Sequence, residues 1–181
     1  MNKLLILDLD ETLIHASEAP LEIEVEHDFL ACDYFVYKRP YVDHFLEFCQ
    51  NEFKVAVWTS AGSEFAEIVY KKLFGERYQL EFLWSRERCT RYFRPEYYDS
   101  EYIKNLKKSK RKGFPLEQTI MIDNTPAKLI KNYGNLVKVI DFEGDQKDKE
   151  LLFLIEYLKE LKLVKNVRKI EKRGWRNKFA I

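Results

Sequence analysis

Short apolar runs alternate with helical patterns along these 181 residues, and this alternation limits the possible folds more than any other feature. Runs with the length of buried strands occur at 3–9, 53–58, 81–84, 119–123 and 136–140. Apolar residues recur at helical spacing between and after them, at 40–51, 64–74, 126–131 and 147–164. Strands and helices in this alternation predict an α/β fold with a central, mainly parallel sheet flanked by helices.

The segment after the first predicted strand favours a small insertion. Apolar residues alternate there with glutamates, which indicates a strand with one solvent-facing side, at Leu21, Glu22, Ile23, Glu24, Val25 and Glu26. A second strand is predicted over 29–37, with Asp28 near the turn. We therefore expect one domain over residues 1–165 with a β-hairpin insertion at about 18–38. A basic tail over 166–181 is expected to fray.

Composition narrows the class of protein. The chain is 46% hydrophobic, enough for a core, and its formal net charge of +1 selects no partner by charge alone. Its three cysteines have irregular spacings, so we expect reduced thiols in a cytoplasmic protein, or a nuclear one if the source is eukaryotic. No apolar stretch approaches the ~20 residues of a membrane span, so we expect no membrane partner. We also expect a monomer.

Polar residues follow three of the predicted strands at the point where each strand ends. They are Asp8, Asp10 and Thr12 after the first strand, Thr59 and Ser60 after the second, and Asp123 and Asn124 after a later one. The carboxyl ends of parallel strands meet at one crevice. Each cluster alone is commonly a turn or a helix cap, but all three in this order favour an enzyme site.

The three carboxylates of this crevice, those of Asp8, Asp10 and Asp123, predict a metal site. Carboxylates this close repel one another unless a cation or protons neutralise them. Mg²⁺ prefers such oxygen ligands, usually together with substrate phosphate. A carboxylate held in line with the phosphorus atom can attack it and form an aspartyl-phosphate. The residues therefore indicate phosphoryl chemistry that depends on Mg²⁺.

The run Asp8-Leu9-Asp10-Glu11-Thr12-Leu13 resembles the first motif of the haloacid dehalogenase superfamily. The resemblance implies that Asp8 is the nucleophile and that Asp10 is the general acid and base, with a backbone carbonyl that also binds Mg²⁺. It implies that Thr12 orients the site.

Two more segments resemble further motifs of the superfamily. Residues 57–61 resemble the second motif, which implies that Thr59 donates a hydrogen bond to phosphate, with Ser60 beside it. Residues 122–126 resemble the fourth motif, which implies that Asp123 is a metal ligand and that Asn124 supports the metal site. The third motif is a lysine that neutralises phosphate charge. Lys104 is our choice, with Lys107 and Lys108 as alternatives.

The resemblance narrows to one branch, the small phosphatases of the RNA polymerase II C-terminal domain with their Dullard-like and NLI-interacting-factor-like relatives. It is carried by residues 38–42, 86–89 and 102–104 with the motifs above, and it runs from Lys3 to Val164. It implies a Rossmann-like core, a β-hairpin insertion and no large cap domain. Two departures stand out: the order Thr59-Ser60-Ala61, where the branch has Thr-Ala-Ser, and a long stretch at 90–101.

The branch implies a Mg²⁺-dependent phosphoserine or phosphothreonine protein phosphatase whose partner is a phosphorylated protein. The basic stretch 86–112 is either an ordinary solvated surface or a rim on which Arg86 and Arg91 contact substrate. Its aromatic residues could also stack nucleic-acid bases; they are Tyr92, Phe93, Tyr97, Tyr98 and Tyr102. Two alternatives stay open: a phosphatase for small molecules or nucleic-acid ends, and a catalytically weak module that binds proteins.

Overall fold

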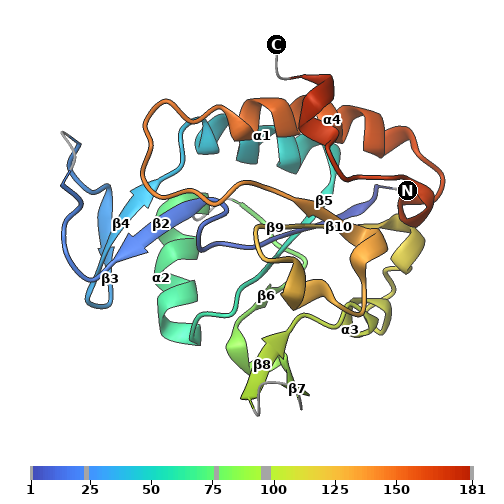
Figure 1. Ribbon diagram of the computed structural model, residues 1–181, viewed down its shortest axis with the longest axis horizontal. Coiled ribbons are helices and arrows are strands. Elements are labelled where there is room, and N and C mark those ends of the chain that lie inside the picture. Colours follow the sequence, from blue (N-terminus) through green and yellow to red (C-terminus); the bar gives the residue numbers. More distant parts are fainter. Residues whose placement is uncertain (1, 23–24, 76–77, 95–98, 180–181) are drawn as a thin grey trace.

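The computed structural model describes residues 2–22, 25–75, 78–94 and 99–179. They form three layers, with one parallel sheet as the middle layer (Figure 1). The sheet has the strand order β10-β9-β1-β5-β6, and every pairing in it is parallel. Its strands are β1 (Leu4–Leu7), β5 (Lys54–Trp58), β6 (Leu83–Trp84), β9 (Thr119–Asp123) and β10 (Leu136–Lys138). The predicted α/β fold with a central parallel sheet is confirmed.

The longer helices match the predicted segments closely. They are α1 (Val42–Glu52), α2 (Ser63–Phe74) and α4 (Glu150–Leu163), and Figure 1 shows α1 and α4 side by side over one face of the sheet. The helix predicted over 126–131 is a short 3-10 helix, η4 (Pro126–Leu129). Within the described part of the chain, no helix is both long and apolar enough to cross a bilayer.

The strand β1 separates two apolar cores. Leu5 and Leu7 pack into a core with residues of α1, α2 and α4. Leu4 and Ile6 pack into the core on the other face, together with Trp58 and its neighbours. All four side chains of β1 are fully buried, because successive residues of a strand point to opposite faces and both faces are covered.

The insertion after β1 is a three-stranded antiparallel sheet in the order β2-β4-β3, with β2 at Ile14–Ser17, β3 at Phe29–Ala31 and β4 at Tyr34–Lys38. The single strand predicted over 29–37 is therefore wrong, because the chain turns back at Cys32 and Asp33. Asp28 lies before β3 rather than at this turn.

The strand predicted over 21–26 is wrong for its described residues, which are irregular, whereas Ile23 and Glu24 lie outside the described residues. The strand β4 is already paired on both edges, by β2 and β3, so it offers this segment no backbone partner. The described residues of this segment do not join the outer strands β2 and β3 either.

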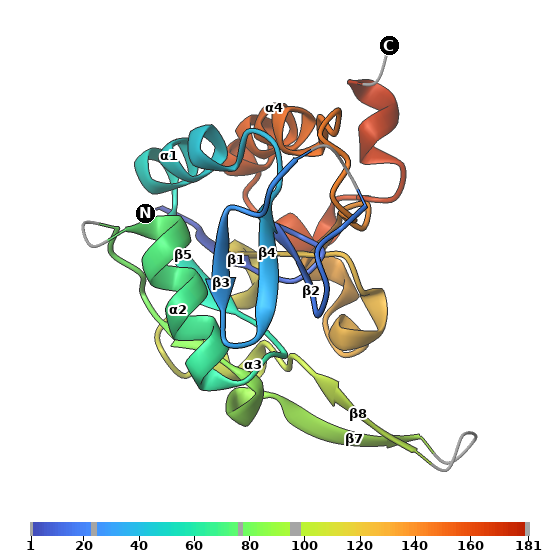
Figure 2. The ribbon, with the colours of Figure 1, turned by 90° about the vertical axis from the view of Figure 1, so that its left-hand side faces the viewer.

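A second feature that the sequence analysis did not predict is the hairpin of β7 (Thr90–Arg94) and β8 (Asp99–Ile103) within the basic stretch 86–112. Figure 2 shows this hairpin extending away from the body of the molecule. Aromatic and β-branched residues in both segments, such as Tyr92, Phe93 and Tyr102, favour strands there. Tyr97 and Tyr98 lie outside the described residues. The remainder of the stretch holds two short helices, η1 (Arg86–Arg88) and α3 (Lys107–Lys110).

The basic tail packs against the body instead of fraying. It contains two 3-10 helices, η6 (Val167–Lys169) and η7 (Trp175–Lys178), and buries Val167, Lys172 and Trp175. The ring of Trp175 stacks on that of Tyr157 of α4, with centroids 5.2 Å apart. The sequence did not predict this packing, because the few apolar residues of the tail lie among many charged residues and give no periodic pattern.

One buried arginine ties the loop after β1 to the start of α4. The guanidinium of Arg39 donates to both carboxylate oxygens of Asp148, at 3.0 and 2.7 Å, and to the Thr12 carbonyl oxygen at 3.0 Å. It also lies 5.4 Å from the centre of the Phe142 ring. Asp148 accepts in addition from the backbone N–H of Glu150, the first residue of α4.

Replacing Arg39 by methionine is expected to lower the free energy of unfolding by about 3 kcal/mol, because it strips the Asp148 carboxylate of its cation and leaves the Thr12 carbonyl without its donor. Urea denaturation measures the change. The control is Arg111→Met, at an exposed residue, which should cost no more than about 0.5 kcal/mol. Equal effects of the two substitutions would contradict this role of Arg39.

Candidate active site

Asp8 follows the carboxyl end of β1, and its side chain is fully buried. Its Oδ1 accepts from the backbone N–H of Leu9 at 2.9 Å and lies 2.8 Å from the Lys104 ammonium nitrogen. Its Oδ2 lies 3.4 Å from the ammonium nitrogen of Lys128, a residue whose side chain is 22% exposed. The Oδ2 atom is therefore the freer oxygen, and it faces the more accessible of the two ammonium groups.

Asp123 ends β9, the strand next to β1, and is also fully buried. Its Oδ2 accepts from the Lys104 ammonium at 2.7 Å, and its Oδ1 accepts from the backbone N–H of Thr125 at 2.8 Å. Lys104 therefore bridges the carboxylates of Asp8 and Asp123. The alternatives lie elsewhere: Lys107 is exposed, and Lys108 donates to the Arg88 carbonyl oxygen.

Asp10 and Thr59 form the third part of the site. The Thr59 hydroxyl follows β5, donates to Asp10 Oδ2 at 3.0 Å and accepts from the backbone N–H of Ala61 at 2.9 Å. Thr59 is fully buried, whereas Asp10 is partly exposed. The hydroxyl is thus fixed in direction by the loop after β5 and holds one oxygen of the Asp10 carboxylate.

The surroundings of the three carboxyl groups differ, and so do their pKa values. Burial would raise the pKa of Asp8, but the ammonium groups of Lys104 and Lys128 outweigh it and hold the pKa below its usual value. Burial raises the pKa of Asp10, and the neighbouring Asp8 charge adds to this effect. Burial, with the Asp8 charge again adding, raises the pKa of Asp123 to about 6. The carboxyl groups of Asp10 and Asp123 thus lack enough neighbouring positive charge to offset the effect of burial on their pKa values.

Several residues expected in the site are not joined to these carboxylates. The Thr12 hydroxyl is buried without a hydrogen-bond partner among the described residues. The Ser60 hydroxyl is in the same situation, and the Asn124 amide oxygen accepts from the Thr125 hydroxyl, at 3.2 Å. The backbone carbonyl oxygen of Thr12, by contrast, accepts from Arg39.

The two arginines expected at the substrate rim differ in how they are held. Arg86 donates from Nε to the Ser60 carbonyl oxygen at 2.8 Å, and its guanidinium lies 5.9 Å from the ring centre of Tyr102. Arg91 is exposed on β7, directly opposite Tyr102 in the hairpin register. Arg86 is thus attached to the loop that carries Thr59, whereas Arg91 has no polar partner within the described ranges.

Lys128 is the residue that sequence reasoning missed. It lies in η4, on the first turn after the loop that follows Asp123, and its carbonyl oxygen accepts from the Lys104 backbone N–H at 2.7 Å. Burial would lower its pKa, but Asp8, Asp123 and Asp10 together raise it. The sequence did offer one signal for Lys128: it lies in the helix that was predicted to begin at the end of the fourth motif.

The residues present fit a divalent cation. No group of three or more His, Cys, Asp or Glu side chains in the described segments could hold an ion without other ligands. Mg²⁺ needs fewer, since it commonly binds one or two carboxylates and completes its coordination with water and phosphate. Asp8 and Asp123 supply two carboxylates, and the raised pKa values of Asp10 and Asp123 mark negative charge that a cation would stabilise.

Solved structures of low sequence identity share this fold. One is the structure of Fcp1, described as an essential RNA polymerase II CTD phosphatase, with a TM-score of 0.59 and 18% identity over 90% of this chain and 51% of that chain. Another is a haloacid dehalogenase superfamily hydrolase from Geobacter sulfurreducens, with a TM-score of 0.55 and 10% identity over 87% of this chain and 100% of that one.

Curated relatives are closer in sequence. A probable C-terminal domain small phosphatase of Dictyostelium discoideum is 32% identical over 92% of this chain and 53% of its own length. Phosphatase PSR1 of Saccharomyces cerevisiae is 35% identical over 88% of this chain and 36% of its own length. The chain thus spans about half the length, or less, of these relatives. The model of the NLI interacting factor-like phosphatase family matches residues 3–168, and the chain belongs to that family.

Proposed function

We propose that the protein is a Mg²⁺-dependent phosphomonoester hydrolase that acts through an aspartyl-phosphate on Asp8. The observation that supports this most directly is the state of Asp8. Its carboxylate is buried between two ammonium groups, which keep it ionised, and one oxygen lies beside the partly exposed Lys128. An ionised, fixed carboxylate at the end of a parallel strand is suited to nucleophilic attack on phosphorus.

The proposed reaction has two displacements at phosphorus. An oxygen of Asp8 attacks, the bond from phosphorus to the ester oxygen breaks, and Asp10 gives its proton to the leaving oxygen. Water then attacks the phosphorus of the aspartyl-phosphate, and Asp10 takes up a proton from this water. The bond between phosphorus and the Asp8 oxygen breaks, which releases phosphate and restores the free Asp8 carboxylate. The raised pKa of Asp10 suits a group that must first carry a proton, and the Thr59 hydroxyl directs its carboxylate.

Asp8 and Asp123 would hold Mg²⁺ together with the backbone carbonyl of Asp10, and Asn124 would support the metal site. When bound, the ion neutralises charge on the phosphoryl group. Lys104 and Lys128 add positive charge on the protein side, which favours binding of a dianionic phosphate beside Asp8.

The substrate class we propose is phosphoserine or phosphothreonine in proteins. Two of the proteins named above, the Dictyostelium discoideum relative and Fcp1, are described as C-terminal domain phosphatases. The described residues carry a three-stranded sheet and a hairpin beside the strand ends rather than a large cap domain. Arg86 and Arg91, on either side of Tyr102, would contact the peptide. Comparing kcat/KM for phosphopeptides, small phosphate esters and 5′-phosphorylated oligonucleotides separates these substrate classes.

The proposed activity is tested with p-nitrophenyl phosphate. The native protein should hydrolyse it with Mg²⁺, lose activity in EDTA and regain it when Mg²⁺ is restored. Asp8→Asn should lower turnover by at least about a thousandfold while the circular dichroism spectrum stays native. Undiminished turnover by Asp8→Asn would refute the nucleophile. A folded native protein without activity towards any of the substrate classes would refute the proposed function.

Thr59→Val removes the hydroxyl that positions Asp10 while keeping the side-chain shape. It should lower kcat by about tenfold, since a hydrogen bond to a charged group is lost. Thr59→Ser keeps the hydroxyl and should retain most of the native kcat. Equal kcat values for the two variants would contradict this positioning role, and steady-state kinetics on p-nitrophenyl phosphate give the comparison.

Lys128→Gln should raise KM for phosphate esters by about fivefold, because one of two cations beside Asp8 is removed. Lys128→Arg preserves the charge and should restore KM. The matched control is Lys131→Gln, at an exposed lysine in the next turn whose ammonium lies over Tyr92. A Lys128→Gln enzyme with native KM and kcat would exclude Lys128 from phosphate binding.

A further inference from the structure

The C-terminal tail encloses a cavity of about 760 Å³ along the outer edge of β10, at the end of the parallel sheet. One wall is formed by β10 and the short helix η5 (Tyr133–Asn135), and the other by tail residues 168–176. Pro126, the first residue of η4, also lines the cavity. Because η4 carries Lys128 to Asp8, the cavity and the proposed active site share one short helix.

The tail is held in place by specific contacts with its own backbone and with that of the sheet edge. The Lys172 ammonium donates to the carbonyl oxygens of Gly134, Val167 and Ile170, at 2.8, 2.5 and 2.9 Å. The Trp175 indole N–H donates to the Lys138 carbonyl oxygen at 2.8 Å. A Cβ atom on Gly134 would lie 3.3 Å from the carbonyl oxygen of Arg168, so glycine permits this close approach.

The cavity is strongly basic. Its lining holds six basic residues and one acidic residue, Glu171; the basic residues are Lys138, Arg168, Lys169, Lys172, Arg173 and Arg176. Three of the six already have polar partners. Lys172 donates to backbone carbonyl oxygens, Arg173 pairs with Glu171, and Arg176 pairs with Glu150.

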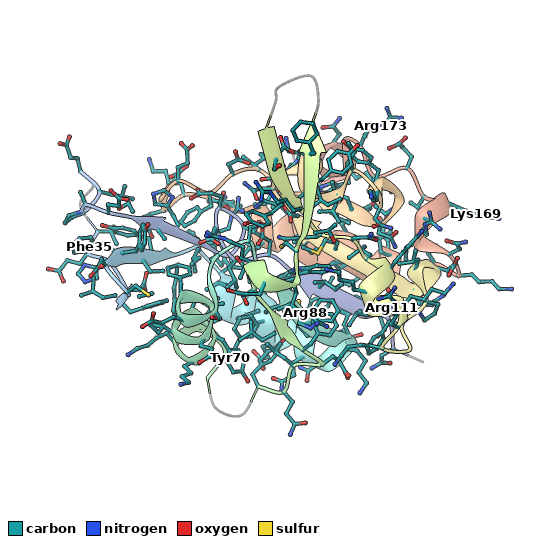
Figure 3. The ribbon with its side chains drawn as sticks, turned by 90° about the horizontal axis from the view of Figure 1, so that it is seen from below. Phe35, Tyr70, Arg88, Arg111, Lys169 and Arg173 are labelled. Atoms are coloured by element: carbon teal, nitrogen blue, oxygen red, sulfur yellow. The ribbon has the colours of Figure 1, made fainter. Side chains whose placement is uncertain are left out.

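The other three cations of the lining are available. The side chains of Lys138, Arg168 and Lys169 are exposed and have no ion pair or hydrogen bond within the described residues. Figure 3 shows Lys169 and Arg173 at the same end of the molecule, opposite Phe35 of the insertion sheet. Cations gathered in one hollow repel one another, so an anion bound there would relieve an existing cost.

We propose that this cavity binds a second phosphate group of the protein substrate, on a residue several positions from the one that is hydrolysed. The inference rests on the proposed function. Arginine and lysine side chains that face a hollow suit phosphate, which arginine can bind through two parallel hydrogen bonds. The volume is ample for a phosphorylated side chain.

The position of the cavity limits the spacing between the two phosphates. Lys138 pairs with Asp123 in the register of β10 and β9, and β9 in turn pairs with β1, so Lys138 lies two strand spacings, about 10 Å, from the end of β1 that precedes Asp8. Pro126 is three residues beyond Asp123 in the chain. An extended peptide advances about 3.3 Å per residue, so a second phosphate about three to six residues away could reach the cavity while the first lies beside Asp8.

The test compares peptides with one phosphoserine to peptides with a second phosphoserine about three to six residues to either side. For the native protein, the best spacing should lower KM by about fivefold relative to the single phosphate. The variant Arg168→Gln/Lys169→Gln should lose this gain, with p-nitrophenyl phosphate and the singly phosphorylated peptide unaffected. The control Lys71→Gln/Lys72→Gln removes the same charge from the exposed last turn of α2 and should keep the gain.

Dissociation constants of the same peptides for the Asp8→Asn variant, with and without the two tail substitutions, test the cavity without turnover. A failure of the proposed activity therefore stays separate from a failure of this inference. Equal affinity for singly and doubly phosphorylated peptides at every spacing would overturn it, as would a gain that survives Arg168→Gln/Lys169→Gln. Thermal stabilisation by inorganic phosphate that needs Arg168 and Lys169, with no gain for any peptide, would assign the cavity to a free phosphate ion and also overturn it.

Discussion

The ammonium group of Lys104 lies between the buried carboxylates of Asp8 and Asp123, and the geometry of the site depends on this contact. Two adjacent carboxylates without a cation would repel each other, and a buried charge that loses its partner costs several kcal/mol. Lys104 therefore fixes the ends of β1 and β9 relative to the chain that follows β8. The same ion pairs keep Asp8 ionised, so the contact that stabilises the site also prepares its chemistry.

This contact also connects the buried carboxylates of the proposed site to surfaces that a substrate could touch. The Lys104 backbone N–H donates to the Lys128 carbonyl oxygen, which joins the base of the β7–β8 hairpin to η4. Pro126 of η4 also lines the tail cavity. On another side of the site, Arg86 donates to the loop after β5. Of the two features that local patterns did not predict, the hairpin is followed directly by Lys104, which contacts Asp8, and the packed tail lines the same cavity as Pro126.

Local sequence patterns were sufficient for the elements whose apolar residues are periodic and whose ends carry polar clusters. They located the five core strands, and they predicted that Asp8, Thr59 and Asp123 follow strand ends. The choice of Lys104 rested on the resemblance, and the local pattern left Lys107 and Lys108 open, because only the path of the chain after β8 brings Lys104 between Asp8 and Asp123. Local patterns missed Lys128, whose direction is set by a single turn of η4. The tail was misjudged because Trp175 and Val167 are isolated anchors within a charged segment.

Asp8 and Asp10 lie two residues apart, yet their pKa values shift in opposite directions, and spacing alone could not have predicted this. The two ammonium groups beside Asp8 lower its pKa, whereas burial, with the Asp8 charge adding to it, raises the pKa of Asp10. Ionising Asp8 therefore makes it harder to ionise Asp10. One carboxyl group is thus held as an anion and its neighbour is biased towards holding a proton, which is what the roles proposed for Asp8 and Asp10 require.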